Sequence, residues 1–305
     1  MQDGTQRSYR GGIYDNPYWT VAKNPSLDDV NRFIGNLQLS FKANSWLTIQ
    51  GKYWYDRYTD ERKLGIDINS ATDRNGFVSD RSEFNTDINT QLLFLLNTDL
   101  NDRVNLNGVF GYDQFKTNRL VRRVDGFGLT IPSFFHVSNS ATQVNIEDVN
   151  RRELRGLFAQ AKLGFDNMLF VNGVYRSDWS STLPEKNNSF DSYGIGLSFV
   201  FTELMNNNSL LNYGKLRASY GKSGNDAPAF STITYYNSGS AGGDGFITNN
   251  EFPLLGQVAY ERSSLLGNNK IKPESTTEYE IGAELKFFKN RIGLDVAYYS
   301  KETSD

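Results

Sequence analysis

The chain has 305 residues, a formal net charge of −3 and no cysteine. The absence of cysteine excludes disulfide frameworks, thiolate metal sites and thiol catalysis. The slightly negative net charge does not indicate a basic surface for binding nucleic acid. No stretch of 18 apolar residues occurs, which excludes a membrane-spanning helix but leaves open a membrane-spanning barrel, where only alternate residues face lipid.

Residues 1–30 are polar, are punctuated by glycine, asparagine and proline, and contain Asn16-Pro17-Tyr18-Trp19. We interpret this segment as a loop. No charged stretch followed by an apolar run, as in a signal peptide, comes after Met1. If the chain forms an outer-membrane barrel, we therefore expect it to be an internal piece of a longer protein.

Ten stretches of alternating apolar and polar side chains follow, and they come in pairs joined by short turns. Alternation with a period of two indicates strands, because successive side chains in a strand point to opposite faces. The five predicted hairpins pair 33–43 with 47–55, 84–96 with 104–112, 157–165 with 169–175, 193–201 with 216–220, and 279–287 with 292–298. The predicted turns include Asn44-Ser45, Asp166-Asn167, Asn206-Asn207-Asn208 and Lys289-Asn290.

The last hairpin shows the alternation best. We predict that its apolar face contacts lipid through Ile281, Leu285, Leu294 and Val296. We predict that its polar face lines a lumen through Glu280, Glu284 and Asp295. One continuous apolar face along strands of this length is typical of a transmembrane barrel.

The connections between hairpins differ from the turns within them. Residues 59–82, 119–151 and 221–273 are long and polar, and only 182–189 is short. Long connections on one side and tight turns on the other are typical of outer-membrane barrels, whose extracellular loops are long and periplasmic turns short. The predicted fold is therefore all-β, an antiparallel meander that forms part of a transmembrane outer-membrane β-barrel.

A soluble β-sandwich is the alternative, for instance a secreted carbohydrate-binding or adhesin-like domain. Sandwich strands usually have about 5–6 residues, which is half the length seen here. A β-solenoid would show a fixed repeat of about 20–50 residues, and none is found. A passive porin is a further alternative within membranes, and an enzyme is disfavoured.

Four segments resemble catalytic or metal-binding motifs but do not fit them. Gly221-Lys222-Ser223 lacks the upstream glycine of a phosphate loop, and His136 is the only histidine. Glu278, which shares a strand face with two other glutamates, is better explained as lumen lining than as part of a glycosidase pair. Asp73 begins a segment that lacks the ligand pattern of a calcium loop. We expect no metal, no cofactor and no enzymatic activity.

Aromatic residues in or next to the long connections are the best candidates for contact with a ligand. They are Phe134, Phe135, Trp179, Tyr235 and Tyr236. An aromatic belt at the membrane surface, or packing within the loops, is the simpler explanation for them.

Three segments resemble the SusC/RagA-type TonB-linked outer-membrane receptors of Bacteroidetes. They are LRASYGKSGND at 216–226, KPESTTEYEIG at 272–282 and FFKNRIGLDV at 287–296. Asn16-Pro17-Tyr18-Trp19 and Asn31-Arg32 also resemble a stretch that precedes two barrel strands in these receptors. The resemblance covers residues 16–305. The plug domain, the energy-coupling box and the C-terminal strands of the family are not in this chain.

The resemblance implies a partial TonB-dependent receptor β-barrel domain over residues 1–305, located in the outer membrane. It implies active import of a large nutrient, either a glycan or an oligopeptide. The partners that it implies are outer-membrane lipid, a SusD-like surface lipoprotein lying on the loops, and the TonB complex acting through a plug.

Overall fold

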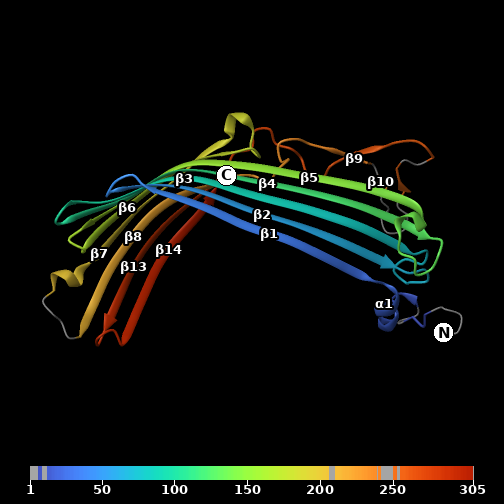
Figure 1. Ribbon diagram of the computed structural model, residues 1–305, viewed down its shortest axis with the longest axis horizontal. Coiled ribbons are helices and arrows are strands. Elements are labelled where there is room, and N and C mark those ends of the chain that lie inside the picture. The colour runs from blue at the N-terminus through green and yellow to red at the C-terminus, as the bar shows by residue number, and fades with distance from the viewer. Residues whose placement is uncertain are drawn as a thin grey trace. The chain divides into compact units, whose positions relative to one another are not determined.

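The computed structural model describes residues 6–8, 12–205, 210–238, 240–241, 250–252 and 255–304. Within these residues, ten strands form one antiparallel sheet in the order β1-β2-β3-β4-β5-β6-β7-β8-β13-β14 (Figure 1). This confirms the predicted all-β meander, with an open sheet rather than a closed barrel. Among the described residues, no helix is long and apolar enough to cross a membrane, a finding that concerns helices alone.

The elements of the sheet follow one another in chain order. They are β1 (Ser26–Lys42), β2 (Leu47–Ile66), β3 (Phe77–Asn101), β4 (Val104–Leu129), β5 (Ser140–Phe165), β6 (Leu169–Ser180), β7 (Ser189–Val200), β8 (Leu211–Asn225), β13 (Glu274–Phe287) and β14 (Ile292–Ser304). Among the described residues outside the sheet lie α1 (Pro17–Lys23), 3₁₀ turns at Val137–Asn139, Glu185–Asn187 and Phe201–Leu204, and the short strands β9 (Tyr236–Ser238), β10 (Ser240–Ala241), β11 (Asn250–Glu251) and β12 (Tyr260–Arg262).

The chain forms two compact units. The first contains residues 1–37, 53–89 and 116–151, and the second contains residues 38–52, 90–115 and 152–305. Strands β1 to β5 each contribute residues to both units. The sheet from β6 to β14 lies wholly in the second unit, which also holds all three segments that carry the family resemblance.

In the first unit, residues 1–30 are not entirely loop as predicted, because α1 begins at Pro17. Asn16 caps this helix, its Oδ1 accepting a hydrogen bond from the Tyr18 N–H at 3.0 Å, and proline is favoured at the first helical position. Trp19 anchors the helix through a 2.9 Å bond from Nε1 to Ser70 Oγ. The Asn16-Pro17 pair is a helix-start signal that the loop interpretation overlooked.

The predicted loop bounds 59–82 and 119–151 are also wrong, because the strands run much further. Polar side chains replace the apolar alternation in these extensions, and they bond across the strands. Arg119 Nε lies 2.6 Å from Glu83 Oε1, and Ser79 Oγ donates to Asp125 Oδ1 at 2.7 Å. Hydropathy alternation therefore ends before the backbone ladder does, and the connections shorten to residues 67–76 and 130–139.

The third long connection is closer to prediction. Strand β8 ends at Asn225 and β13 begins at Glu274, so the connection covers residues 226–273. Two short pairs that the sequence did not predict lie within it, β9 with β12 and β10 with β11.

In the second unit, the register of neighbouring strands gathers the apolar side chains on one face. Residues directly opposite one another in an antiparallel pair share a face. One such row crosses six strands from β5 to β14, and a second runs beside it. The rows are Leu163, Val171, Leu197, Ala218, Ile281 and Tyr298, and Phe165, Leu169, Phe199, Leu216, Ala283 and Val296.

Tight turns set this register. Asp166 and Asn167 have φ angles of 50° and 54°, as the two central residues of a type I′ turn require, and Met168 N–H donates to the Phe165 carbonyl at 2.9 Å. Between β13 and β14 the chain turns at residues 288–291, where Lys289 and Asn290 also have positive φ. The predicted turn at Asn206-Asn207-Asn208 lies outside the described residues.

The buried apolar core is small. The buried apolar side chains among the described residues are Val78, Val121 and Leu129 in the first unit, and Leu93, Leu183 and Val200 in the second. Most large apolar side chains are instead exposed on the sheet. Contiguous apolar surface of this kind marks a membrane or protein contact rather than a water-facing surface.

The turn between β5 and β6 gives a direct test of register. Replacing Asn167 with Val should destabilise the protein by about 1–2 kcal/mol, because a β-branched residue is strained in the left-handed region. Asn167→Gly is the matched control and should be neutral. Thermal unfolding of the protein at its natural length in detergent measures both, and equal unfolding temperatures for the two variants would contradict the turn geometry.

Candidate functional site

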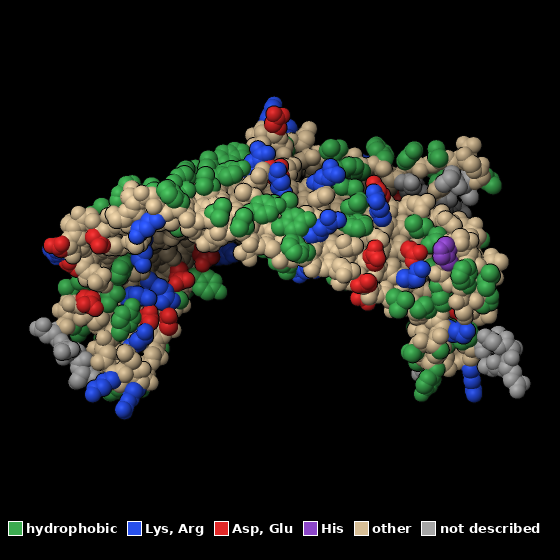
Figure 2. Space-filling view, in the orientation of Figure 1, with side chains coloured by type: hydrophobic (Ala, Val, Ile, Leu, Met, Phe, Trp, Pro, Cys, Tyr) green, Lys and Arg blue, Asp and Glu red, His purple; other side chains and the backbone are tan. Residues whose placement is uncertain are grey.

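The second unit carries charged side chains on the face opposite the apolar rows. The side chain of Arg217 on β8 reaches carboxylates on both β13 and β14, with Nε 3.0 Å from Glu280 Oε1 and Nη2 2.9 Å from Asp295 Oδ1. Its neighbour Lys215 places Nζ 2.7 Å from Glu284 Oε2. Figure 2 shows Lys and Arg side chains beside Asp and Glu over the region where Figure 1 places β8, β13 and β14.

The predicted lumen-facing residues Glu280, Glu284 and Asp295 thus share one face. Each of them pairs with a cation on β8, and Glu284 also pairs with Lys286 on its own strand. The four predicted lipid-facing residues share the other face, where Ile281, Leu294 and Val296 are 59%, 49% and 56% exposed and Leu285 is half-buried. The structure separates the two sets as the alternation predicts. What each face contacts stays a prediction.

Cations also cover aromatic rings on the charged face. Lys162 Nζ lies 4.9 Å from the centre of the Phe170 ring, and Lys286 Nζ lies 4.9 Å from that of Tyr213. Arg176 lies over Phe158 at 5.6 Å and also bonds Asp113 and Asp178 at 2.8 and 2.6 Å. Each ring therefore has one side occupied by a neighbouring charge and cannot offer that side to a sugar.

A well-connected carboxylate in this unit is Asp226, the first residue after β8. Arg152 of β5 donates to it from Nε and Nη2 at 2.9 and 2.8 Å, in a two-pronged pair. Thr182 Oγ1 donates at 3.1 Å, and Ser180 Oγ donates as well. Only 6% of the Asp226 side chain is exposed, against 31% for Arg152.

These bonds determine the charge state of Asp226. Burial alone would raise its pKa, because a carboxylate loses hydration. Hydrogen bonds from Arg152, Ser180 and Thr182 stabilise the ionised form, and together with the charge of Arg152 they hold the pKa of Asp226 below its ordinary value. Asp226 therefore remains ionised near neutral pH and joins the start of the 226–273 connection to β5 and to the β6–β7 turn.

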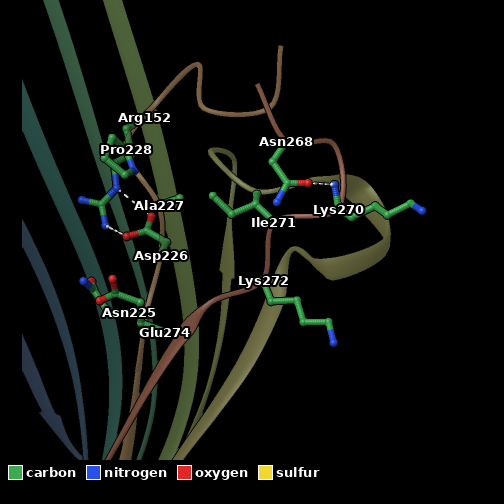
Figure 3. A pocket seen from close by; sticks show the side chains of 10 residues that line it. All are labelled: Arg152, Asn225, Asp226, Ala227, Pro228, Asn268, Lys270, Ile271, Lys272 and Glu274. Carbon is green, nitrogen blue, oxygen red and sulfur yellow. Dashed lines mark hydrogen bonds and ion pairs between the residues drawn. The ribbon is translucent and has the colours of Figure 1, made fainter. Parts of the chain in front are cut away.

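A hollow of about 1010 Å³ adjoins this carboxylate. Figure 3 shows Arg152, Asp226 and Ala227 on one side of it and Ile271 on the other. The full lining is Arg152, Asn225, Asp226, Ala227, Pro228, Asn268, Lys270, Ile271, Lys272 and Glu274. This is the site with the most developed geometry, and the sequence did not single it out. The signal in the sequence that could have indicated this site is the polar pair Asn225-Asp226, where strand β8 ends.

The five predicted ligand-contacting aromatics do not converge on this hollow. In the first unit, Phe134 stacks on His136 with ring centres 6.0 Å apart, and Phe135 packs against Gly65. In the second unit, Tyr235 packs edge-on against Phe230 at 6.0 Å. Tyr236 is exposed on β9, and Trp179 is a strand residue on β6.

Three of the four resembling motifs adopt the local structures expected of them, and the lumen-lining role expected of Glu278 stays a prediction. Gly221-Lys222-Ser223 lies inside strand β8, and Asp73 Oδ1 caps a turn by accepting from the Asn75 N–H at 3.0 Å. His136 lies between β4 and β5, with Nδ1 2.7 Å from Ser138 Oγ. In the described part of the chain, no group of three or more His, Asp or Glu side chains is arranged to hold a metal.

Known proteins resemble this chain in sequence. A family model described as TonB dependent receptor-like, beta-barrel matches residues 2–305. TonB-dependent receptor P26 of Formosa agariphila is 22% identical over 321 residues, covering all of this chain and 31% of that receptor. TonB-dependent receptor P39 of the same organism is 26% identical over 243 residues, covering 76% of this chain and 22% of that receptor.

Solved structures resemble it in fold. The RagAB peptide transporter matches with a TM-score of 0.81 at 18% identity, covering 94% of this chain and 31% of that one. The ferric-catecholate import receptor Fiu of E. coli matches with a TM-score of 0.55 at 13% identity, covering 90% and 41%. The predicted resemblance to SusC/RagA-type receptors is confirmed, with these structures supporting it at the level of the fold.

The Asp226 contacts predict a specific pH dependence. Because the folded pKa is lowered, the stability contributed by Asp226 is complete above the unfolded carboxyl pKa of about 3.9 and is lost as pH falls through the lower folded value. Hydrogen exchange, corrected for intrinsic rates, should show protection near residues 152 and 180–182 from pH 7 to about pH 4, and loss below that. Asp226→Asn should remove this transition, and an unchanged profile would contradict the assignment.

Proposed function

Because this chain belongs to the TonB-dependent receptor-like β-barrel family, we propose that it supplies barrel wall and extracellular connections for the active import of a large nutrient. The family consists of receptors and transporters, not enzymes, and its members lie in the outer membrane, where this chain acts. The chain spans 31% and 22% of the two Formosa receptors it matches. Import is therefore proposed for the receptor as a whole.

The observation that carries the proposal is the separation of the two faces in the second unit. Apolar rows across six strands remain exposed, while the opposite face holds paired charges. Apolar-out and polar-in alternation is what a barrel requires when lipid surrounds it and water fills its interior. Ile281, Leu285, Leu294 and Val296 would then contact acyl chains, and Glu280, Glu284 and Asp295 would line the lumen.

Tyrosines on the apolar face support a membrane boundary. Tyr175 pairs with Tyr193 across strands, Tyr220 pairs with Tyr279, and the Tyr193 and Tyr220 ring centres are 6.4 Å apart. Tyrosine belts mark the level of the lipid headgroups. From Tyr279 to Phe287 the strand rises roughly 21 Å along the membrane normal at a rise of about 3.4 Å per residue and a tilt of about 40°, close to the usual apolar band of about 25 Å.

Trp179 lies on the same face as these tyrosines, further along β6. It follows Tyr175 on β6 by four residues, so the two side chains point to the same side of the sheet. This position fits an interfacial aromatic better than contact with cargo. Phe134, Phe135, Tyr235 and Tyr236 remain proposed ligand contacts.

Energy and partners follow from the family. We propose that the TonB complex drives import through a plug domain, and that a SusD-like surface lipoprotein lies over the extracellular connections. The cargo would be a glycan or an oligopeptide. The RagAB importer is described as a peptide transporter, and Fiu as a ferric-catecholate import receptor, so this fold serves chemically different cargoes.

Neighbouring residues on β14 test the membrane assignment. Val296 belongs to the apolar row and Ala297 to the charged face. Val296→Arg should cost about 2–4 kcal/mol near the bilayer midplane, whereas Ala297→Arg, beside Glu280 and Asp295, should leave assembly almost unchanged. Folding of the natural-length receptor into lipid vesicles measures both. Equal losses, or a larger loss for Ala297→Arg, would refute the face assignment.

Uptake by cells tests import itself. Cells that carry the receptor gene should take up labelled oligosaccharides or oligopeptides from a mixed panel, and a deletion strain should not. Uptake should also stop when the proton gradient across the inner membrane is dissipated, because TonB-dependent import consumes that energy. Identical uptake with and without the gene, across the whole panel, would end the proposal.

A further inference from the structure

The hollow beside Asp226 lies at a fork in the sheet. Strands β8 and β13 are paired up to Asn225 and Glu274, and the chain then leaves the sheet on both sides. Residues 226–228 form one arm and residues 271–273 form the other, and both arms contribute to the lining of the hollow. Figure 3 shows Ala227 and Ile271, one from each arm, on opposite sides of it.

The arms carry backbone groups to which no described residue forms a hydrogen bond. Within the described part of the chain, the N–H and carbonyl groups of Ala227 and Lys272 have no hydrogen-bond partner. Pro228 and Pro273 supply no N–H of their own. An extended peptide can add as a further strand where backbone N–H and carbonyl groups are available for hydrogen bonds, as they are on these two arms.

Hydrogen bonds at the base of the fork hold both arms in place. The four hydrogen bonds to Asp226 fix the residue directly before Ala227. On the other arm, Asn187 Nδ2 donates to the Ile271 carbonyl at 3.4 Å, and the Lys270 N–H donates to Asn268 Oδ1 at 2.9 Å. The fork is thus preorganised, which lowers the entropy lost on binding.

The side chains around the hollow favour one class of ligand. Three cations and two carboxylates line it, so it carries one excess positive charge. Lys270 and Lys272 point away from Arg152, while Ile271 points toward Ala227 (Figure 3). The described lining contains no aromatic side chain on which a sugar ring could stack. Free backbone groups, a small apolar wall and a positive rim together suit an acidic peptide.

We propose that this hollow binds an extended peptide that carries an acidic side chain or its own C-terminal carboxylate. Main-chain hydrogen bonds run to Ala227 and Lys272, and the carboxylate lies near Lys270 and Lys272. A small apolar side chain rests against Ile271. The inference builds on the proposed import function, because it names an oligopeptide as the cargo held at this place.

Binding to the natural-length receptor in lipid nanodiscs tests the proposal with three labelled probes: a pool of Asp/Glu-containing hexapeptides, a pool of Lys/Arg-containing hexapeptides, and maltohexaose. The acidic pool should bind most tightly. A photocrosslinker in place of Ile271 should capture the acidic pool. Failure of both peptide pools to bind, or tight binding of maltohexaose alone, would overturn the inference.

Two variants localise the binding. The double variant Lys270→Glu and Lys272→Glu should weaken binding of the acidic pool by about tenfold or more and strengthen binding of the basic pool, because the charge of the rim is reversed. Lys289→Glu, in the turn that follows the opposite end of β13, is the matched control and should change the binding of neither pool. Ala227→Pro, which removes one N–H, should weaken the binding of both pools. Acidic binding unaffected by every variant would place the peptide elsewhere.

Uptake separates this inference from the function on which it rests. If cells still import cargo through a receptor carrying Lys270→Glu and Lys272→Glu with unchanged peptide preference, the peptide site is wrong and import stands. If the wild-type receptor imports nothing, the proposed function itself fails.

Discussion

The constraint on which the rest of this structure depends is the antiparallel register of the sheet. Because side chains alternate and opposite residues share a face, fixing the pairing of Ile281 with Ala218 and Tyr298 also fixes where every other side chain of those strands lies. A slip of one residue would bring Glu280 and Glu284 into the apolar row. The tight turns with positive φ, at Asp166-Asn167 and at Lys289-Asn290, therefore define the functional surface as well as the hairpins.

Charge pairing extends the sheet where hydropathy alternation stops. In the first unit, Arg119 with Glu83 and Ser79 with Asp125 bridge strand segments in which the regular apolar alternation has ended. In the second unit, Arg217 satisfies carboxylates from two different strands. Such pairs leave this face of the sheet hydrophilic, with its charges largely compensated.

The fork between β8 and β13 changes the chemistry of the wall at one place. Along most of the pairing, backbone groups bond to the neighbouring strand, so only side chains are available to a ligand. Beyond Asn225 and Glu274 the two strands separate, and Asp226 fixes the point of separation through Arg152. At this place the main chain of Ala227 and Lys272 is open to the proposed peptide, while the long connection beyond it supplies the variable surface that loops usually carry.

The sequence by itself determined the strands and their faces, because a period of two is a local property that survives without knowledge of any partner; Leu294 and Asp295 were assigned to opposite faces in this way. It also carried the turns at Asp166 and Lys289, whose chemistry is local. Tertiary structure decided what depends on residues distant in sequence: the extension of β3 and β4 through cross-strand bonds such as that from Ser79 to Asp125, and the meeting of Arg152 with Asp226 across 74 residues. No periodicity encodes that contact, because it exists only once β5, β6 and β8 lie in register.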